Sequence, residues 1–274
     1  MKYQICLTLV NANSKKELIK SLKTLFENSK DSDLRIAVAI VDNNSHDNIR
    51  EVESMFPHTQ VLIRDKNYGF GSSQNVAMTM FDAEYYFVLN PDTEFFGENN
   101  TLKMLYNFME KNKYIGIVAP KIVYPDGSLQ YSCYRFPYFT QPFFSRAKFN
   151  FGGKTKKIND RFLMKDFDHS SPQPVDWVMG SAMFVRQKAI AEVGGFDEIF
   201  WMYAEDSDWC HRMWEKKWAV YYFPEVVVRH THGRASAKVP GLIWPIITNK
   251  YARAHIKSWL KYFWKWKGNH RFYR

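Results

Sequence analysis

Short apolar segments alternate with segments of helical periodicity over the first 120 residues of the chain. Apolar residues three and four apart, such as Leu18, Leu22 and Leu25, predict an amphipathic helix, whereas the unbroken run RIAVAIV predicts a buried strand. We expect strands over residues 3–10, 35–41, 61–64, 85–89 and 115–119, and helices over residues 15–28, 47–56, 73–81 and 99–112. This alternation is typical of an α/β fold, a mostly parallel sheet with helices on both faces.

The alternation ends near residue 120. Residues 121–175 are rich in Pro, Phe and Tyr without a clear period, and the chain contains no internal repeat or low-complexity linker. With 274 residues, of which 46% are hydrophobic and 24% charged, the chain can bury a large core and is neither disordered nor collagen-like. We predict one α/β domain over residues 1–236 and a basic, aromatic, amphipathic helical tail over residues 237–274.

Cysteine usage and hydropathy bear on the compartment. Cys6, Cys133 and Cys210 lie far apart and form no CxxC pair, which argues against a disulfide scaffold or a structural zinc site and favours a reducing environment. The segment ICLTLV is followed at once by Asn11 and is too short for a secretory leader. No run reaches the roughly 18 apolar residues of a membrane span. We therefore expect a cytoplasmic protein, soluble or peripheral on the inner face of the cell membrane.

Positive charge is concentrated in the tail. Residues 240–274 contain no acidic residue and account for +8 of the formal net charge of +10. A helix would separate its basic and apolar side chains into two stripes, namely Lys257, Lys261 and Lys265 opposite Ile256, Trp259, Phe263 and Trp266. Such a helix suits an anionic bilayer surface. Packing on the protein's own core and contact in a homodimer are alternatives, whereas nucleic acid is disfavoured because the rest of the chain carries little excess charge.

Two predicted strands end in carboxylates. Asp42 follows IAVAIV, and Asp92 follows YYFVLN and one proline. Ligands in open parallel sheets bind beyond the carboxyl ends of the strands, so both carboxylates could face one crevice. Asp92 could hold Mg²⁺ or Mn²⁺ and leave positions open for diphosphate oxygens, although an aspartate after proline also begins ordinary turns. The glycine loop NYGFG lies between them, and its backbone could approach an anionic ligand closely.

An acidic cluster occupies residues 197–208. If a helix begins near Glu205, Asp208 and Arg212 form a pair across one turn. Glu205 and Asp206 then lie at a helix N-terminus, where negative charge is favoured. One interpretation is therefore a capped acidic turn, and the other is a general base directed at a substrate hydroxyl.

A histidine pair, His230 and His232, follows the apolar strand YYFPEVVVR. A neutral imidazole can ligate a metal ion or form a hydrogen bond with a phosphate. Single histidines at strand ends usually do neither, so the pair gains significance only because the same chain contains Asp92.

Six segments in this order resemble the inverting glycosyltransferases of family 2. These enzymes have the GT-A fold, a Rossmann-like, mostly parallel sheet that binds nucleoside diphosphate sugars. The segments are LVNANSKKEL, VDNNS, NYGFGSSQN, LNPD, VDWVMGSAMFVRQKAIAEVGGFDEIFWMYAEDSDWCHR and HTHGRAS, and the resemblance covers residues 1–236. Within them, WVMGSAMFVR and EDSDWCHR are most similar to bacterial rhamnosyltransferases of cell-wall and surface polysaccharide synthesis.

The resemblance implies a role for each matched residue. Asp206 would be the catalytic base, and Glu205 would position the acceptor or share that role. Asp92 would coordinate a divalent cation, Mn²⁺ or Mg²⁺, with His230 and His232 as further metal ligands. The nucleotide sugar would be bound by Val10, Asn11, Asp42, Asn67, Gly69, Phe70, Asn75, Asn90, Trp177, Gly180 and Ser181.

The sequence departs from the family pattern at two positions. Asn90 replaces the first aspartate of the family's DxD motif, which weakens metal binding at that position. Ala12 stands where the family commonly has an aromatic residue that stacks on the nucleotide base, which leaves the base preference open.

The implied reaction is transfer of a sugar, with dTDP-L-rhamnose as the favoured donor, to a hydroxyl of a lipid-linked saccharide. Two other functions are compatible with parts of the sequence. A sugar nucleotidyltransferase would need a glycine-rich loop near the N-terminus, and residues 8–16 contain no glycine. A non-catalytic carbohydrate-binding module would need aromatic residues and amides, but not a nucleoside pocket with converging aspartates.

Overall fold

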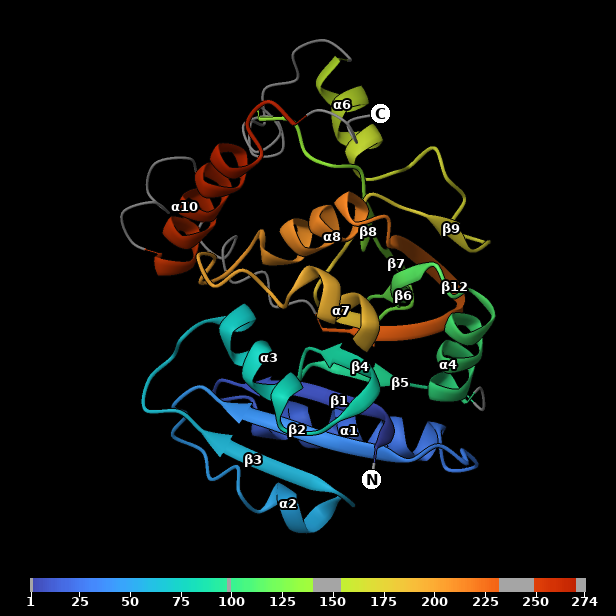
Figure 1. The fold of residues 1–274 in the computed structure, drawn as a ribbon, viewed down its shortest axis with the longest axis vertical. Helices are drawn as coiled ribbons and strands as arrows, with labels where there is room; N and C mark the ends of the chain where they lie inside the picture. Colours follow the sequence, from blue (N-terminus) through green and yellow to red (C-terminus); the bar gives the residue numbers. More distant parts are fainter. Residues whose placement is uncertain (1, 98–99, 140–153, 232–248, 270–274) are drawn as a thin grey trace.

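The computed structural model describes residues 2–97, 100–139, 154–231 and 249–269, which form a central sheet with helices on both faces (Figure 1). The helices are α1 (Lys15–Asn28), α2 (Val52–Met55), α3 (Phe70–Thr79), α4 (Thr101–Lys111), α6 (Lys154–Phe162), α7 (Gln187–Val193), α8 (Glu205–Glu215) and α10 (Lys250–Lys265). The strands are β1 (Tyr3–Asn11), β2 (Ile36–Asp42), β3 (Thr59–Ile63), β4 (Ala83–Leu89), β5 (Thr93–Phe95), β6 (Ile115–Val123), β7 (Leu129–Gln130), β8 (Cys133–Tyr134), β9 (Gln173–Pro174), β10 (Trp177–Val178), β11 (Ala182–Arg186) and β12 (Ala219–His230).

The main sheet has the strand order β3-β2-β1-β4-β11-β6-β12-β5, with β7 paired to β6 and β9 paired to β12. The strands from β3 to β4 are parallel to one another. Strand β11 is antiparallel to both β4 and β6, and β12 is parallel to β6. As a result β2, β4, β6 and β12 all run in one direction and end at the same edge of the sheet.

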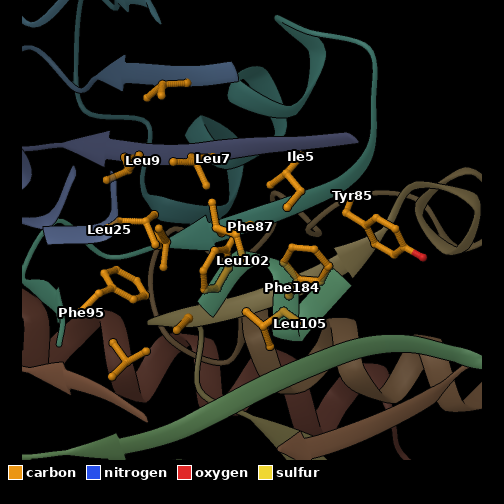
Figure 2. Packing of buried hydrophobic residues seen from close by; sticks show 14 of the residues in the cluster. Ile5, Leu7, Leu9, Leu25, Tyr85, Phe87, Phe95, Leu102, Leu105 and Phe184 are labelled. Carbon is orange, nitrogen blue, oxygen red and sulfur yellow. The ribbon is translucent and has the colours of Figure 1, made fainter. Parts of the chain in front are cut away.

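Helices bury both faces of the sheet. On one face, Leu7 lies in a hydrophobic cluster with Leu25 of α1 and Leu105 of α4 (Figure 2). On the other face, Cys6 belongs to a cluster that contains Trp209 of α8. Full burial of one such leucine contributes about 1.5–3 kcal/mol, so these two layers account for much of the stability of the domain. The α/β sheet predicted from the alternating pattern is confirmed.

The first half of the chain follows the predicted elements closely, with one shortened helix. Helix α1 has the predicted bounds, 15–28. The helix predicted over 47–56 is reduced to the single turn of α2, because Asp47 is bound in a loop. Its Oδ1 accepts a hydrogen bond from Asn11 Nδ2 (2.9 Å), and its Oδ2 accepts one from the backbone N–H of Lys15 (3.0 Å).

The second half contains a strand order that the pattern did not predict. Strand β11 enters the sheet between β4 and β6, and all five of its residues are buried. Its short apolar run, AMFVR, is compatible with any sheet position, and only contacts with distant strands determine where it pairs.

Helix α10 lies beside α8 (Figure 1) and packs through a stripe that contains Ser258 and Tyr262. Ser258 Oγ donates a hydrogen bond to the carbonyl of Met202 (2.8 Å). Lys265 and Trp266, which the helical pattern places on opposite sides, both contact the carboxylate of Asp208. None of the helices in the described ranges is long and apolar enough to cross a membrane.

Candidate active site

The predicted site residues gather at the edge of the sheet where the parallel strands end. Asp42 is the last residue of β2, and His230 is the last residue of β12. Asn90 and Asp92 follow β4, whose last residue pairs with Ala182 at the start of β11. The common direction of β2, β4 and β12 therefore brings the strand-end carboxylates and the histidine to one edge.

Asp42 is held in place by its neighbours on β1 and in the following loop. Its Oδ1 accepts a hydrogen bond from Asn11 Nδ2 (2.7 Å), and its Oδ2 accepts one from the backbone N–H of Ser45 (2.9 Å). The side chain of Asn11 also donates to Ser45 Oγ (3.1 Å). With only 2% of its surface exposed, Asp42 has a fixed orientation next to Val10 and Asn11, the end of β1.

Asn43 connects the Asp42 loop to the glycine loop. Its Nδ2 donates to the carbonyl of Gly69 (3.2 Å), and its Oδ1 accepts a hydrogen bond from Ser73 Oγ (2.6 Å). The glycine loop is further shaped by Asn67, whose Oδ1 accepts from the Gly69 N–H (2.9 Å). Sequence reasoning missed Asn43, although it directly follows Asp42 at the strand end.

The glycine loop is also pinned to the segment that precedes α8. The N–H of Phe70 donates to the carbonyl of Trp201 (3.1 Å), and the indole N–H of Trp201 donates to the carbonyl of Asn67 (3.2 Å). Gly69 has φ +92°, and a Cβ atom there would overlap the carbonyl of Trp201. Only glycine satisfies both the left-handed backbone and this close approach. These contacts bring the glycine loop next to the acidic cluster at residues 197–208.

Asp206 lies on the first turn of α8, next to the start of β11. Its Oδ2 accepts a hydrogen bond from the N–H of Gly180 (3.0 Å), and its Oδ1 accepts one from the N–H of Ser207 (2.8 Å). The next residue after Gly180, Ser181, accepts a hydrogen bond at its carbonyl from the N–H of Asn90 (2.9 Å). Two adjacent peptide groups thus join the predicted base to the loop that carries Asp92.

Glu205 and Asp206 have different protonation properties. Burial, and then the charge of Asp206, raise the pKa of Glu205 well above its usual range. Burial also raises the pKa of Asp206, but the N–H groups of Gly180 and Ser207 favour its charged form. Among the described residues, Glu205 Oε2 has no hydrogen-bond partner. Glu205 therefore holds its proton more tightly than Asp206 does.

Backbone strain directly precedes these carboxylates. Tyr203 has φ +68° and Ala204 has φ +66°, a conformation that non-glycine residues adopt rarely. Two consecutive residues of this kind cost on the order of 1–3 kcal/mol each, and the surrounding contacts must hold them. Such strain is concentrated at functional sites, and here it sets the direction in which α8 begins.

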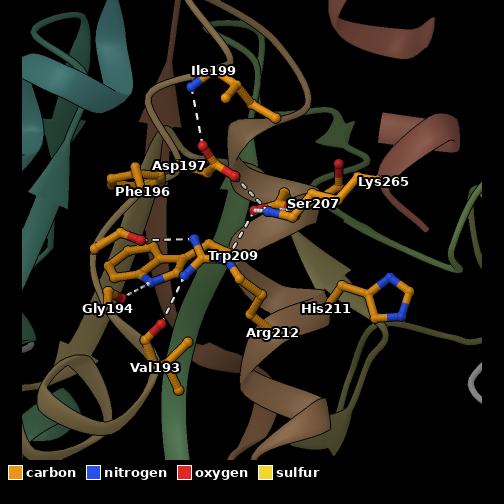
Figure 3. A network of polar contacts seen from close by, with 12 residues as sticks. Val193, Gly194, Phe196, Asp197, Ile199, Ser207, Trp209, His211, Arg212 and Lys265 are labelled. Carbon is orange, nitrogen blue, oxygen red and sulfur yellow. Dashed lines mark hydrogen bonds and ion pairs between the residues drawn. The ribbon is translucent and has the colours of Figure 1, made fainter. Parts of the chain in front are cut away.

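The remainder of the acidic cluster anchors α8. Asp208 pairs with Arg212 (2.9 Å), as the four-residue spacing predicts, and Arg212 also donates to the carbonyls of Val193 (3.0 Å) and Gly195 (2.7 Å) (Figure 3). Asp208 is fully buried. The contacts of Asp208 agree with the interpretation as a structural turn, whereas the catalytic interpretation of Glu205 and Asp206 stays a prediction.

Asp92, Asn90 and His230 meet around one ring nitrogen. His230 Nε2 lies 3.2 Å from Asp92 Oδ1 and 3.3 Å from Asn90 Nδ2, and its Nδ1 lies 3.2 Å from Gln130 Oε1. With Gln130 as acceptor, the ring proton is on Nδ1 and the Nε2 lone pair is directed at the Asp92 carboxylate. Asn90 Nδ2 lies at the same Nε2 atom, and a proton on Nε2 or a divalent cation between Nε2 and the carboxylate would each suit this geometry.

Asp92 and His230 alone are fewer ligands than a complete protein metal site contains. No group of three or more His, Cys, Asp or Glu residues in the described part of the chain is arranged to hold a metal ion. Mg²⁺ and Mn²⁺ commonly bind through one or two protein ligands together with substrate phosphates, which agrees with an incomplete set. The third predicted ligand, His232, lies outside the described residues. Sequence reasoning missed Gln130, because it lies in the segment without periodicity.

Two further predicted residues have contacts that stabilise the framework. Asn75 accepts from the N–H of Phe196 (2.8 Å) and donates to its carbonyl (2.9 Å), so it clamps α3 to the loop before α8. Trp177 stacks on Tyr134 with ring centroids 4.2 Å apart and donates to the carbonyl of Arg135 (3.0 Å). Their predicted contacts with the nucleotide sugar stay predictions.

Comparison with known families assigns this arrangement. The model of "Glycosyl transferase family 2" matches residues 5–192, which include the Asp42 loop, the glycine loop, Asp92 and Gly180. The chain belongs to glycosyl transferase family 2. The resemblance inferred from the six segments is thereby confirmed, and the protein is a glycosyltransferase.

Two curated relatives of this glycosyltransferase are rhamnosyltransferases. The N-acetylglucosaminyl-diphospho-decaprenol L-rhamnosyltransferase of Mycobacterium tuberculosis is 25% identical over 225 residues, 75% of this chain and 69% of the relative. The rhamnosyltransferase WbbL of Escherichia coli is 26% identical over 251 residues, 88% of this chain and 87% of the relative.

A solved structure supports the GT-A fold. A crystal structure of GalNAc-T7 with UDP, GalNAc and Mn²⁺ matches this glycosyltransferase with a TM-score of 0.64 at 11% identity. The match covers 98% of this chain but only 49% of that one, so the chain spans about half the length of the solved protein. At this identity the likeness concerns the fold alone.

Proposed function

We propose that this glycosyltransferase transfers L-rhamnose from dTDP-L-rhamnose to a hydroxyl of a lipid-linked saccharide, with inversion at the anomeric carbon. The observation that carries the proposal is the connection from Asp206 through Gly180 and Ser181 to Asn90, beside Asp92 and His230. This connection supports the proposal because it links a carboxylate suited to be a base to residues suited to hold a divalent cation and the diphosphate. Only two adjacent peptide groups lie between them.

In the proposed reaction Asp206 removes the proton of the acceptor hydroxyl while the hydroxyl oxygen attacks the anomeric carbon. The bond between that carbon and the diphosphate breaks in the same displacement, and the nucleoside diphosphate leaves from the opposite face. Glu205, whose pKa is raised, would in its protonated form donate a hydrogen bond to the acceptor and thereby orient it. No covalent sugar–enzyme intermediate is required.

Asp92 and His230, with Asn90 as a weaker neutral ligand, would hold Mn²⁺ or Mg²⁺. A bound divalent cation neutralises the charge that develops on the leaving diphosphate. The rotation of His230 is fixed by Gln130, so the Nε2 atom has one direction available. Asp42 and Asn11 would bind the nucleoside on the far side of the glycine loop.

Rhamnose is supported by the names of both curated relatives, and the lipid-linked acceptor by the name of the Mycobacterium tuberculosis relative. Action at the inner face of the cell membrane is supported by the basic and aromatic composition of residues 240–274.

The proposed function is tested with a panel of nucleotide sugars and purified protein, with the released nucleotide as the readout. We expect release of dTDP from dTDP-L-rhamnose that requires Mn²⁺ or Mg²⁺ and increases with a polyprenyl-diphosphate-linked acceptor. Thermal shifts with dTDP, UDP and GDP, each with and without Mn²⁺, provide a second measurement. A response to free glycans alone would instead indicate a carbohydrate-binding module, and diphosphate production from a nucleoside triphosphate would indicate a nucleotidyltransferase.

A further inference from the structure

A groove of about 780 Å³ lies between α10 and the loop that precedes α8, outside the residues assigned to catalysis. Its lining is mainly aromatic and aliphatic, from Phe139, Ile199, Leu260, Phe263 and Trp264. Several of these side chains are unusually exposed, namely Trp264 (79%), Phe139 (53%) and Leu260 (49%). Contiguous exposed apolar surface of this kind marks a binding site more often than it occurs by chance.

Lysines surround this groove, and none of its lining residues is acidic. Lys265 Nζ forms ion pairs with Asp197 Oδ2 (2.6 Å) and Asp208 Oδ1 (2.8 Å). Lys261 donates to the carbonyl of Ile199 (2.7 Å), and the ammonium of Lys267 lies 5.7 Å from the ring of Trp264. Neither contact neutralises the charge of Lys261 or Lys267. The groove therefore matches a ligand with a hydrocarbon chain and an anionic head.

The groove is linked to the glycine loop through the segment that precedes α8. Ile199 lines the groove, and Trp201, two residues later, is bonded to the glycine loop. Asp206 follows Ile199 by seven positions, which limits the distance between their Cα atoms to about 25 Å even if the chain were fully extended. The groove and the glycine loop are thus both contacted by one short segment, residues 199–201.

We propose that this groove binds the isoprenoid chain of the lipid-linked acceptor, with the diphosphate at Lys261 and Lys267. The inference rests on the proposed function and identifies where its acceptor is held. The volume lies within the roughly 300–1,000 Å³ of small-molecule sites and suits one chain, whereas contact with a bilayer surface requires no hollow.

The test measures binding of farnesyl diphosphate by calorimetry, without sugar donor or divalent cation. We expect the wild type to bind it, and Trp264→Ala and Leu260→Ser to bind at least tenfold more weakly. Met55→Ala, which removes an exposed apolar side chain on α2, is the matched control and should bind like the wild type. Inorganic diphosphate measured in parallel should bind more weakly than farnesyl diphosphate, because the chain supplies most of the contact. Circular dichroism melting of each variant verifies that the fold is retained.

Two outcomes would overturn the groove assignment. One is that the wild type does not bind farnesyl diphosphate or that both groove variants bind it as tightly as the wild type. The other is that the variants lose only sedimentation with phosphatidylglycerol vesicles, which would make the surface a bilayer contact. The proposed function is judged separately, by nucleotide release. If the groove variants lose binding of farnesyl diphosphate but the wild type transfers no sugar, the groove assignment holds and the proposed function is wrong. If the wild type transfers sugar and the groove variants bind farnesyl diphosphate normally, the proposed function holds and the groove assignment is wrong.

Discussion

At the scale of single residues, the site depends on the difference between two adjacent carboxylates. Asp206 accepts two backbone hydrogen bonds, whereas Glu205 is 6% exposed and its Oε2 has no partner among the described residues. Hydrogen bonds to the anion favour ionisation and burial opposes it, which agrees with the proposed roles of Asp206 as base and Glu205 as hydrogen-bond donor. Sequence alone presents them only as neighbours on one helical turn.

Asp206→Asn should reduce kcat for sugar transfer by on the order of 10²–10⁴-fold, because the amide cannot accept the acceptor proton. Glu205→Gln should stay within about tenfold of the wild type, because glutamine resembles the protonated glutamate that the structure favours. Initial rates of nucleotide release, measured for both variants at saturating donor, check this. Equal losses in the two variants would show that the base is not assigned correctly.

Asp92→Ala should abolish the Mn²⁺-dependent part of dTDP binding, because it leaves Asn90 and His230 without the only carboxylate of that cluster among the described residues. Calorimetric titration of dTDP with and without Mn²⁺ measures the effect. Asp33→Ala, which removes an exposed carboxylate paired with Lys103, is the control and should bind like the wild type. If dTDP binding by Asp92→Ala depended on Mn²⁺ as strongly as in the wild type, the metal ion would have to be bound by other residues.

At the scale of elements, the site is built by loops that contact one another across the sequence. The glycine loop contacts the loop before α8, and the start of β11 contacts both α8 and the loop after β4. Each loop is short and is positioned by the element that it leaves. A change in one contact should therefore affect binding at positions that it does not touch directly.

Gly69→Ala should destabilise the protein by about 2–4 kcal/mol and weaken dTDP binding, because it combines a left-handed backbone with overlap on Trp201. Gly127→Ala is the matched control, since Gly127 has φ +84° and nothing within 4 Å of an added Cβ. It should lose only the backbone component, about 1 kcal/mol. Urea unfolding of both variants and calorimetry with dTDP separate the two contributions. Equal stability losses would mean that the Trp201 contact carries no energy.

A helix or strand can be predicted from the sequence when the residues that determine it lie within the element itself. Helix α1 and strand β2 could be predicted from spacing alone because each has one apolar face or a fully buried run. The insertion of β11 between β4 and β6 could not, because pairing partners more than 60 residues away select its place. For the same reason the strand-end residues Asp42 and Asp92 were recognisable, whereas Gln130 and Trp201 acquire their roles only through contacts with distant segments.

At the scale of the whole molecule, two buried titratable groups link stability to pH in opposite directions. Burial lowers the pKa of His211 from 6.5 to about 3, with a contribution from Lys265. Its stabilising effect is thus present above pH 6.5 and is lost as the pH falls. Glu205, whose pKa is raised, stabilises the fold at low pH and loses this effect as the pH rises above about 4.5.

The free energy of unfolding should therefore pass through a maximum as the pH changes. His211 should cause the decline on its acid side and Glu205 the decline on its alkaline side. Glu205→Gln should flatten the decline on the alkaline side, and His211→Phe, which can keep the stacking against Phe136 and Trp266, should flatten the decline on the acid side. Urea unfolding between pH 4 and 8 measures both slopes. Unchanged slopes in the two variants would show that other groups dominate the pH response.

The contact of α10 with Asp208 has a consequence for biosynthesis. Asp208 is completely enclosed two positions beyond the proposed base, and Lys265 and Trp266 supply two of its partners. During translation these partners leave the ribosome more than 50 residues after Asp208 itself. In a nascent chain shorter than that, the carboxylate of Asp208 has its partner Arg212 but lacks Lys265 and Trp266, so we expect α8 to be completed only after Trp266 has emerged.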